Sequence, residues 1–391
     1  MTDRARDLLA RAPVIDGHND LLWEAREKFG YDFDRLDIAQ PQPEVMTDIP
    51  RIKAGGLGGQ FWSVYVPSDL PGDEAVTATL EQIDALFAMV RRYPDVFELT
   101  VTADDVERAT AAGRVASMIG VEGGQSIGCS LGALRVLARL GARYMTLTHN
   151  HNTPWADSAT DEPAHGGLTR FGEEVVREMN RLGVLVDLSH VSADTMAGAI
   201  EVSEAPVIFS HSNARALCDV TRNVPDDVLA KVPANGGVLM ATFVPVFLTP
   251  EGAGMNRAGW EQERRLQAEH PDDAEAVRAE MKSWFEANPD PEATASDVAD
   301  HVDHLREVCG IEHVGIGGDY DGSPWMPSDM PDVSAYPVLF EELLRRGYSE
   351  QDLALVSRGN ALRVLREAET VAERLRTERP PSRARIADLD A

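Results

Sequence analysis

The sequence predicts a single (β/α)8 TIM barrel of the α/β class. Eight short apolar runs, most of them rich in Val, Ile and Thr, recur along the 391 residues, and most end in a polar or charged residue. Segments with helical periodicity lie between these runs. Near-continuous apolarity is typical of strands buried on both faces of a parallel sheet. Eight such strands alternating with helices favour a closed barrel, and a doubly wound sheet is the alternative.

Most of the predicted strands end at a side chain that could bind a metal or transfer a proton. In chain order they are PVIDGHND (13–20), GGQFWSVYVP (58–67), VASMIGVEG (115–123), ARYMTLTH (142–149), GVLVDLSH (183–190), APVIFSHS (205–212), GGVLMATFV (236–244) and EHVGIGGD (312–319).

Helical periodicity is clearest over residues 75–92, 131–140, 169–182 and 192–201. Ser192 is a good N-cap residue, and Gly141 and Gly183 stand where the preceding helices should end. The stretch 256–309 is rich in Glu, Arg and Ala and predicts two or three helices, part of them an insertion before the last strand. We therefore expect one catalytic domain over residues 1–377. The charged tail 378–391 is expected to leave the fold as a weakly ordered extension.

Composition limits the partners. The formal net charge is −28, with 65 acidic and 37 basic residues, which argues against nucleic acid because phosphate binding needs clustered Lys and Arg. No stretch approaches the roughly 20 apolar residues of a membrane span, so no membrane partner is expected. The N-terminus lacks the apolar core of a signal peptide, and the three cysteines have no CxxC spacing. These observations predict a cytoplasmic protein.

Four histidines and three carboxylates stand at the ends of six predicted strands. Because the carboxyl ends of all barrel strands open on one face, these residues should converge although they are far apart in the chain. They are His18, Asp20, Glu122, His149, His190, His211 and Asp319.

Imidazole and carboxylate without thiolate suit zinc, manganese or iron. His18 and Asp20 are two positions apart and point to the same side of a strand. His190 and His211 come from neighbouring strands and form a second pair. Glu122 lies between the pairs in barrel order and could bridge two metals. Asp319 and His149 then remain for proton transfer and electrophilic work.

Several longer motifs resemble the renal, or membrane, dipeptidase family of zinc peptidases, within the amidohydrolase-type barrels. The resemblance runs from VIDGHND at Val14 to GNALRVL ending at Leu365. The other motifs are VEGG (121–124), YMTLTHNHNTPWADS (144–158), VDLSH (186–190), FSHSNARALC (209–218), TRNVPDD (221–227) and GIGGDYDG (315–322). Like that family, and unlike the wider superfamily, the chain opens with His-x-Asp in place of His-x-His.

The resemblance implies two zinc ions, one bound by His18, Asp20 and Glu122 and the other by Glu122, His190 and His211. It also implies a bridging hydroxide as the nucleophile, His149 and Arg222 as substrate-binding groups, and Asp319 as the general base that then protonates the leaving amine. The implied substrates are dipeptides, including those with a C-terminal D-residue, and a homodimer is possible.

Several alternatives stay open. His151 could form a rival metal pair with His149, Asp321 could replace Asp319 as the base, and Asp16 could orient a ligand. Five further histidines are expected to be solvated: His165, His270, His301, His304 and His313. The same site could act on a lactam, lactone or amidine. A different hypothesis is that the barrel is catalytically silent and only binds a ligand.

Overall fold

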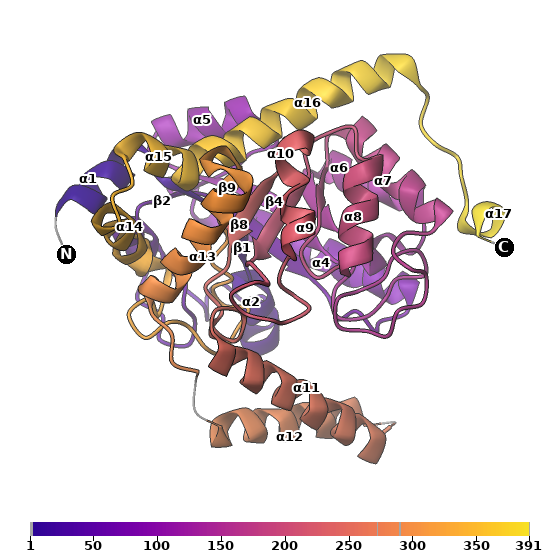
Figure 1. Ribbon diagram of the computed structural model, residues 1–391, viewed down its shortest axis with the longest axis horizontal. Coiled ribbons are helices and arrows are strands. Elements are labelled where there is room, and N and C mark those ends of the chain that lie inside the picture. The colour runs from indigo at the N-terminus through magenta and orange to yellow at the C-terminus, as the bar shows by residue number, and fades with distance from the viewer. Residues whose placement is uncertain (1–2, 272, 289–290, 391) are drawn as a thin grey trace.

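Eight parallel strands close into a barrel in the computed structural model, which describes residues 3–271, 273–288 and 291–390 (Figure 1). The order around the barrel is β2-β1-β9-β8-β7-β6-β5-β4, and β4 returns to β2 through parallel pairs from Gly59 with Ala116 to Tyr65 with Glu122. The predicted fold class is confirmed. The barrel strands are β1 (Val14–Asn19), β2 (Leu57–Tyr65), β4 (Val115–Glu122), β5 (Ala142–Thr146), β6 (Leu185–Asp187), β7 (Ile208–Ser212), β8 (Val238–Ala241) and β9 (Val314–Ile316).

A ninth strand, β3 (Phe97–Leu99), was not predicted. It pairs in parallel with Val115–Ser117 at the start of β4, before β5 joins that edge at Ile119. Three residues are too few to show a strand pattern in the sequence, and β3 adds to the edge of β4 without entering the barrel wall.

The predicted helices form where the capping residues indicated. The side chains of Thr169 and Ser192 accept the backbone N–H groups of Gly172 and Thr195, and Gly183 ends its helix with a left-handed φ of 74°. The helices are α1 (Asp3–Arg11), α2 (Leu21–Phe29), α3 (Ile49–Gly55), α4 (Gly72–Arg92), α5 (Ala103–Ala111), α6 (Leu131–Leu140), α7 (Arg170–Leu182), α8 (Ala193–Val202), α9 (Asp226–Leu229), α10 (Val232–Asn235), α11 (Pro250–Glu269), α12 (Ala274–Ala287), α13 (Ala295–Cys309), α14 (Tyr336–Arg345), α15 (Glu350–Ala354), α16 (Asn360–Glu378) and α17 (Ile386–Leu389).

The long segment between β8 and β9 divides into two parts. Helix α13 packs on the barrel with a buried face that includes Val298, Val302 and Leu305, and it is the crossover helix of this unit. Helices α11 and α12 form a separate hairpin, called here the roof hairpin, which Figure 1 shows standing away from the barrel helices. The two helices are joined by their own apolar cluster, centred on Leu266, Val277 and Met281.

The C-terminal tail does not leave the fold as predicted but lies along α7. The Asp390 carboxylate accepts the Phe171 N–H at 3.1 Å and the Thr169 hydroxyl at 2.6 Å, so it caps the N-terminus of α7. The Ser382 N–H donates to Glu178 on the same helix at 3.3 Å. A carboxylate is favourable at a helix N-terminus because unpaired N–H groups and the helix dipole face it.

The barrel interior is filled up to the level of the candidate site. Ile15, Phe61, Met118, Tyr144 and Met240 belong to one buried cluster. A Cβ at position 120 would lie 2.2 Å from the Tyr144 ring, so only glycine leaves room for this side chain. Tyr144 can therefore cross the barrel and bring its hydroxyl to the layer of metal-type ligands above.

Candidate metal centre and active site

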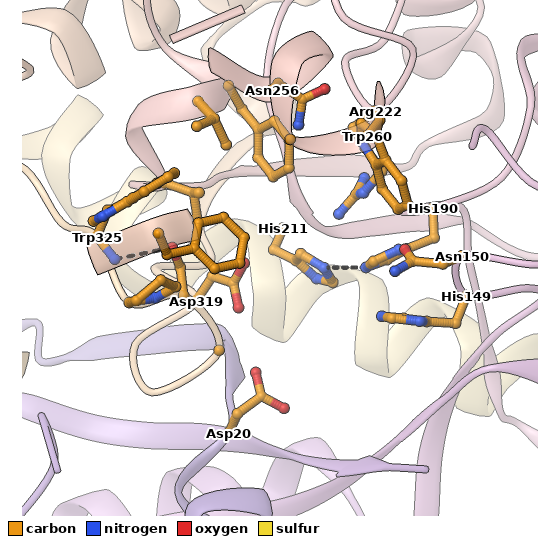
Figure 2. Close-up of a pocket in the computed structure, with 18 of the residues that line it drawn as sticks. Asp20, His149, Asn150, His190, His211, Arg222, Asn256, Trp260, Asp319 and Trp325 are labelled. Atoms are coloured by element: carbon orange, nitrogen blue, oxygen red, sulfur yellow. Dashed lines mark hydrogen bonds between the residues drawn. The ribbon is translucent and has the colours of Figure 1, made fainter. Parts of the chain in front are cut away.

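The carboxyl ends of the barrel strands surround a cavity of about 400 Å³ (Figure 2). Seven of the eight predicted site residues line it, and His18, only 1% exposed, lies directly against that group. His18 and His211 are within β1 and β7, and Glu122 ends β4; the others follow β1, β5, β6 and β9 by one to three residues, except Arg222 in the loop after β7. The structure thus brings together all eight predicted site residues. The seven that line the cavity are Asp20, Glu122, His149, His190, His211, Arg222 and Asp319.

The two carboxylate oxygens of Glu122 face different partners. Its Oε2 lies 3.4 Å from His18 Nε2, while its Oε1 lies 3.1 Å from His190 Nε2 and 3.7 Å from His211 Nε2. His18 Nε2 also lies 3.1 Å from Asp20 Oδ2. One carboxylate therefore joins two sets of donor atoms, which is the arrangement that a bridging ligand needs.

Three groups of converging donors could each hold a metal ion within the described residues. Glu122 belongs to two of them, one with His18 and His211 and one with His149 and His190. The third combines His18, Asp20 and Asp319. These groups contain the five predicted ligands and also His149 and Asp319, so the geometry supports metal binding at this centre without assigning ligands to individual ions.

Charge and protonation favour a cation here. Burial, with the charge of Arg222 nearby, lowers the pKa of His190 well below its usual range, so its imidazole is neutral. Burial lowers the pKa of His18, but its electrostatic interactions with Tyr144, Glu122 and Asp20 outweigh that effect and raise the pKa well above its usual value. His18 Nε2 makes no well-aligned hydrogen bond among the described residues, although Asp20 Oδ2 is 3.1 Å away, and the negative field that favours a proton there also favours a metal ion.

Buried hydroxyl groups orient two of these imidazoles, and these supporting contacts were not predicted. The Tyr144 hydroxyl lies 2.9 Å from His18 Nδ1. The Ser210 hydroxyl donates to Asp187 at 2.6 Å and lies 2.8 Å from His211 Nδ1. Since Ser210 donates to Asp187, it accepts from His211 Nδ1–H, which leaves the lone pair of His211 on Nε2 facing Glu122.

Two site residues have unusual backbone conformations. His190 and Asp319 have φ values of 67° and 62°, in the left-handed region that non-glycine residues rarely adopt. The His190 carbonyl accepts the Ala159 N–H at 2.7 Å and so ties this turn to the segment after β5. Strain of this kind is kept where the surrounding structure fixes a side-chain direction, and here both side chains point into the cavity.

Among the described residues, Arg222 is the only Lys or Arg that lines the cavity, and it is 3% exposed. Its guanidinium lies over the Phe247 ring, 5.2 Å from the centroid, and its Nη1 has no hydrogen-bond partner among the described residues. Burial lowers the pKa of Arg222 to about 10, so the group is still charged at neutral pH. A buried, charged guanidinium with an unpaired Nη1 is suited to bind an anionic group.

The two aspartates of GDYDG have different surroundings. Asp319 lines the cavity, and its Oδ1 is 4.0 Å from His18 Nε2. Burial raises the pKa of Asp319 well above its usual range, with Asp20 and Glu122 adding to the effect. Asp321 is turned away and accepts the Met46 N–H at 2.6 Å. Of these two aspartates, Asp319 is the one that lines the cavity.

Asp16 acts on the backbone and not on a ligand imidazole. One oxygen accepts the His18 N–H at 2.8 Å, and the other accepts the Gly318 N–H at 2.9 Å and the Tyr336 hydroxyl at 2.8 Å. It therefore joins β1 to the segment that carries Asp319.

Comparison with known proteins identifies the relatives of this chain. The sequence profile of the family "Membrane dipeptidase (Peptidase family M19)" matches residues 2–379. The chain belongs to this family. It is 41% identical over 379 residues to Dipeptidase 3 of Mus musculus, covering 96% of this chain and 68% of the mouse protein. It is 40% identical over 384 residues to Dipeptidase verJ of Clonostachys rogersoniana, covering 95% of this chain and 88% of that protein.

Solved structures of other peptidases share the fold. The probable dipeptidase PvdM from Pseudomonas aeruginosa superposes with a TM-score of 0.82 at 26% identity, covering 95% of this chain and 98% of that one. A metallo peptidase from Rhodobacter sphaeroides, liganded with a phosphinate mimic of the dipeptide L-Ala-D-Ala, gives 0.75 at 26% identity, covering 91% and 99%. The chain is therefore a member of a family of metal-dependent dipeptide hydrolases.

The predicted cytoplasmic location is wrong. It depended on the lack of a recognisable signal segment, whereas the matching family is that of the membrane dipeptidases and the mammalian relatives are Dipeptidase 3 proteins. Within the described ranges, no helix combines the length and the apolar character needed to cross a bilayer.

Other histidines of this family member lie outside the metal centre. His151 lies outside the three donor groups found among the described residues, and its Nδ1 is 2.7 Å from the Ser68 hydroxyl. The prediction that His301 is solvated is wrong, because it is fully buried and its Nδ1 accepts the Ala214 N–H at 3.1 Å. The signal was available: His301 follows Val298 by three positions and precedes Leu305 by four, on the buried face of α13.

Proposed function

We propose that this protein hydrolyses dipeptides with two zinc ions held at the centre around Glu122. The observation that carries the proposal is the division of the Glu122 oxygens between His18 on one side and His190 and His211 on the other. His18, Asp20 and Glu122 would hold one ion, and Glu122, His190 and His211 the other. When bound, the two ions supply a water activated at neutral pH and polarise the scissile carbonyl.

The remaining residues bind the substrate and move a proton. Arg222, with its unpaired Nη1, binds the C-terminal carboxylate of the dipeptide. Burial lowers the pKa of His149 to about 4, so its neutral imidazole can donate a hydrogen bond to the oxygen that becomes negative. Asp319 accepts the proton of the attacking water and passes it to the departing amine, since it is the carboxylate of the GDYDG segment that faces the cavity.

The proposed substrates include dipeptides with a C-terminal D-residue. The Rhodobacter sphaeroides relative, solved with a mimic of L-Ala-D-Ala, supports this choice. We also propose that residues 1–377 act as one catalytic domain, with the roof hairpin as a part of it.

Metal content tests the binuclear centre directly. We expect purified protein to carry close to two zinc ions per chain and to lose dipeptide hydrolysis on chelation, because five side chains provide six ligand contacts when Glu122 is shared. His18→Ala should empty mainly one site, and His190→Ala or His211→Ala mainly the other, as measured by elemental analysis. If all three variants keep a single tightly held ion, the binuclear assignment is incorrect.

Arg222→Met tests recognition of the C-terminal carboxylate. We expect transition-state stabilisation to fall by about 2 to 3 kcal/mol, measured as kcat/KM, because a buried charged contact is lost. Arg222→Lys should recover only a part, since an ammonium offers no planar fork.

The control for Arg222 is the same dipeptide with a C-terminal amide. Wild type should strongly prefer the free acid, and Arg222→Met should lose that preference. An unchanged preference in the variant would show that the carboxylate has another partner.

A further inference from the structure

The cavity extends beyond the metal centre, and the chemical character of its lining changes there. Charged and imidazole side chains gather at the metal centre, whereas the rest of the lining is mostly apolar and aromatic. This apolar part includes Phe247, Met255, Trp260, Met281, Phe285 and Trp325. Apart from Phe247, whose ring lies against the Arg222 guanidinium, none of these side chains has a part in the proposed hydrolysis, so we expect them to contact the substrate.

One face of α11 supplies a large part of these walls. Met255, Asn256, Gly259, Trp260 and Glu263 line the cavity at helical spacings of one, three and four, and α12 adds Met281 and Phe285. Figure 2 shows Asn256 and Trp260 on the side of the cavity opposite Asp20. The roof hairpin is thus a wall of the active site as well as an insertion in the barrel.

The roof hairpin is fixed to the barrel at one edge by aromatic contacts. Phe285 meets Trp325, which follows β9, edge-on at 5.1 Å between ring centroids, and Trp284 meets Phe285 at 5.3 Å. Trp260 makes no ring contact with another aromatic side chain among the described residues, and it is partly exposed within the cavity. A large apolar surface that packs against no other ring and lines the cavity is suited to contact a ligand.

We propose that the roof hairpin is the specificity element of this site, and that it selects dipeptides with a large apolar side chain, such as Leu or Phe, which packs against Trp260. This proposal rests on the proposed dipeptidase function. Arg222 lies on the same side of the cavity as Trp260, with its guanidinium over the ring of Phe247 (Figure 2). A dipeptide whose carboxylate binds Arg222 is therefore held next to this apolar wall. The size of the cavity, about 400 Å³, falls in the range that holds small ligands.

The test compares kcat/KM for Ala-Ala with that for Leu-Ala, Phe-Ala, Ala-Leu and Ala-Phe, each with an L- or D-residue at the second position. We expect wild type to prefer the large side chain over Ala about 10-fold or more at one of the two positions, as apolar pockets typically do. Trp260→Ala should remove most of this preference while hydrolysis of Ala-Ala and the zinc content stay near wild type. Trp260→Phe should keep a large part of it.

The matched control is Glu261→Ala, which alters an exposed residue on the opposite face of α11 and should leave the preference unchanged. A wild type that hydrolyses all of these dipeptides equally well, or a preference that survives in Trp260→Ala, would overturn the specificity proposal alone. A wild type with its metal bound that hydrolyses none of them would instead overturn the proposed function.

Discussion

We expect Glu122→Gln to lose bound metal at both sites and to lower kcat/KM by at least about 10³-fold, because metal ligation and the chemistry that depends on it fail together. The glutamine side chain has the same shape, but it has one acceptor oxygen where the carboxylate has two, and its NH₂ group cannot ligate a cation. In the structure the two oxygens of Glu122 face different imidazoles, with Oε2 at 3.4 Å from His18 Nε2 and Oε1 at 3.1 Å from His190 Nε2. Elemental analysis and steady-state kinetics on the same preparation measure both effects.

Ser63→Ala is the matched control for Glu122→Gln. The Ser63 hydroxyl donates to Glu122 Oε2 at 2.9 Å, so its removal disturbs the orientation of the carboxylate but leaves both oxygens in place. Loss of such a supporting contact lowers metal affinity by about 10- to 100-fold, and saturating zinc should restore activity. Glu122→Gln should not recover in this way. A Glu122→Gln protein that retains both ions and hydrolyses dipeptides within tenfold of wild type would contradict the bridging role.

The barrel could be predicted because each of its strands carries a local signal. The eight apolar runs match β1, β2, β4, β5, β6, β7, β8 and β9, and glycines or capping hydroxyls mark several helix ends. The short β3 was not predicted because it pairs with the edge of β4, and the sequence does not show that edge. The tail was misjudged for a similar reason, since Asp390 is held by a helix N-terminus more than 200 positions earlier.

Most of the site residues could be predicted once the barrel was assumed, because strand ends meet on one face. The groups that support them could not. Tyr144 lies on a predicted strand, but its contact with His18 depends on how far a side chain crosses the barrel interior. The Asp187–Ser210–His211 chain depends on the register between two neighbouring strands. The cavity face of α11 depends on how the roof hairpin is placed over the strand ends, and helical periodicity alone does not fix that placement.

We expect Asp319→Asn to lower kcat by about 10²- to 10⁴-fold, the range typical of a lost proton-transfer group, while zinc content changes little. Asparagine keeps the size and polarity of the side chain but cannot accept a proton at neutral pH. Asp319 faces the cavity, and its nearest imidazole nitrogen, His18 Nε2, is 4.0 Å away, compared with 3.1 Å for Asp20. Burial raises the pKa of Asp319 well above its usual range, and cations bound at this centre would lower it again toward the carboxylate form that accepts a proton.

Asp321→Asn separates this role from a general effect of the strained GDYDG turn. Asp319 and Asp321 both have positive φ values, 62° and 68°, but the Asp321 carboxylate accepts the Met46 N–H at 2.6 Å and does not line the cavity. Asp321→Asn should therefore reduce stability more than kcat, as measured by thermal unfolding beside steady-state kinetics. Elemental analysis of Asp319→Asn distinguishes a lost base from a lost ligand, since a ligand variant would lose zinc together with activity. If Asp319→Asn works at near wild-type rates while Asp321→Asn is inactive with its metal bound, the base is Asp321, and its side chain must turn toward the cavity when substrate binds.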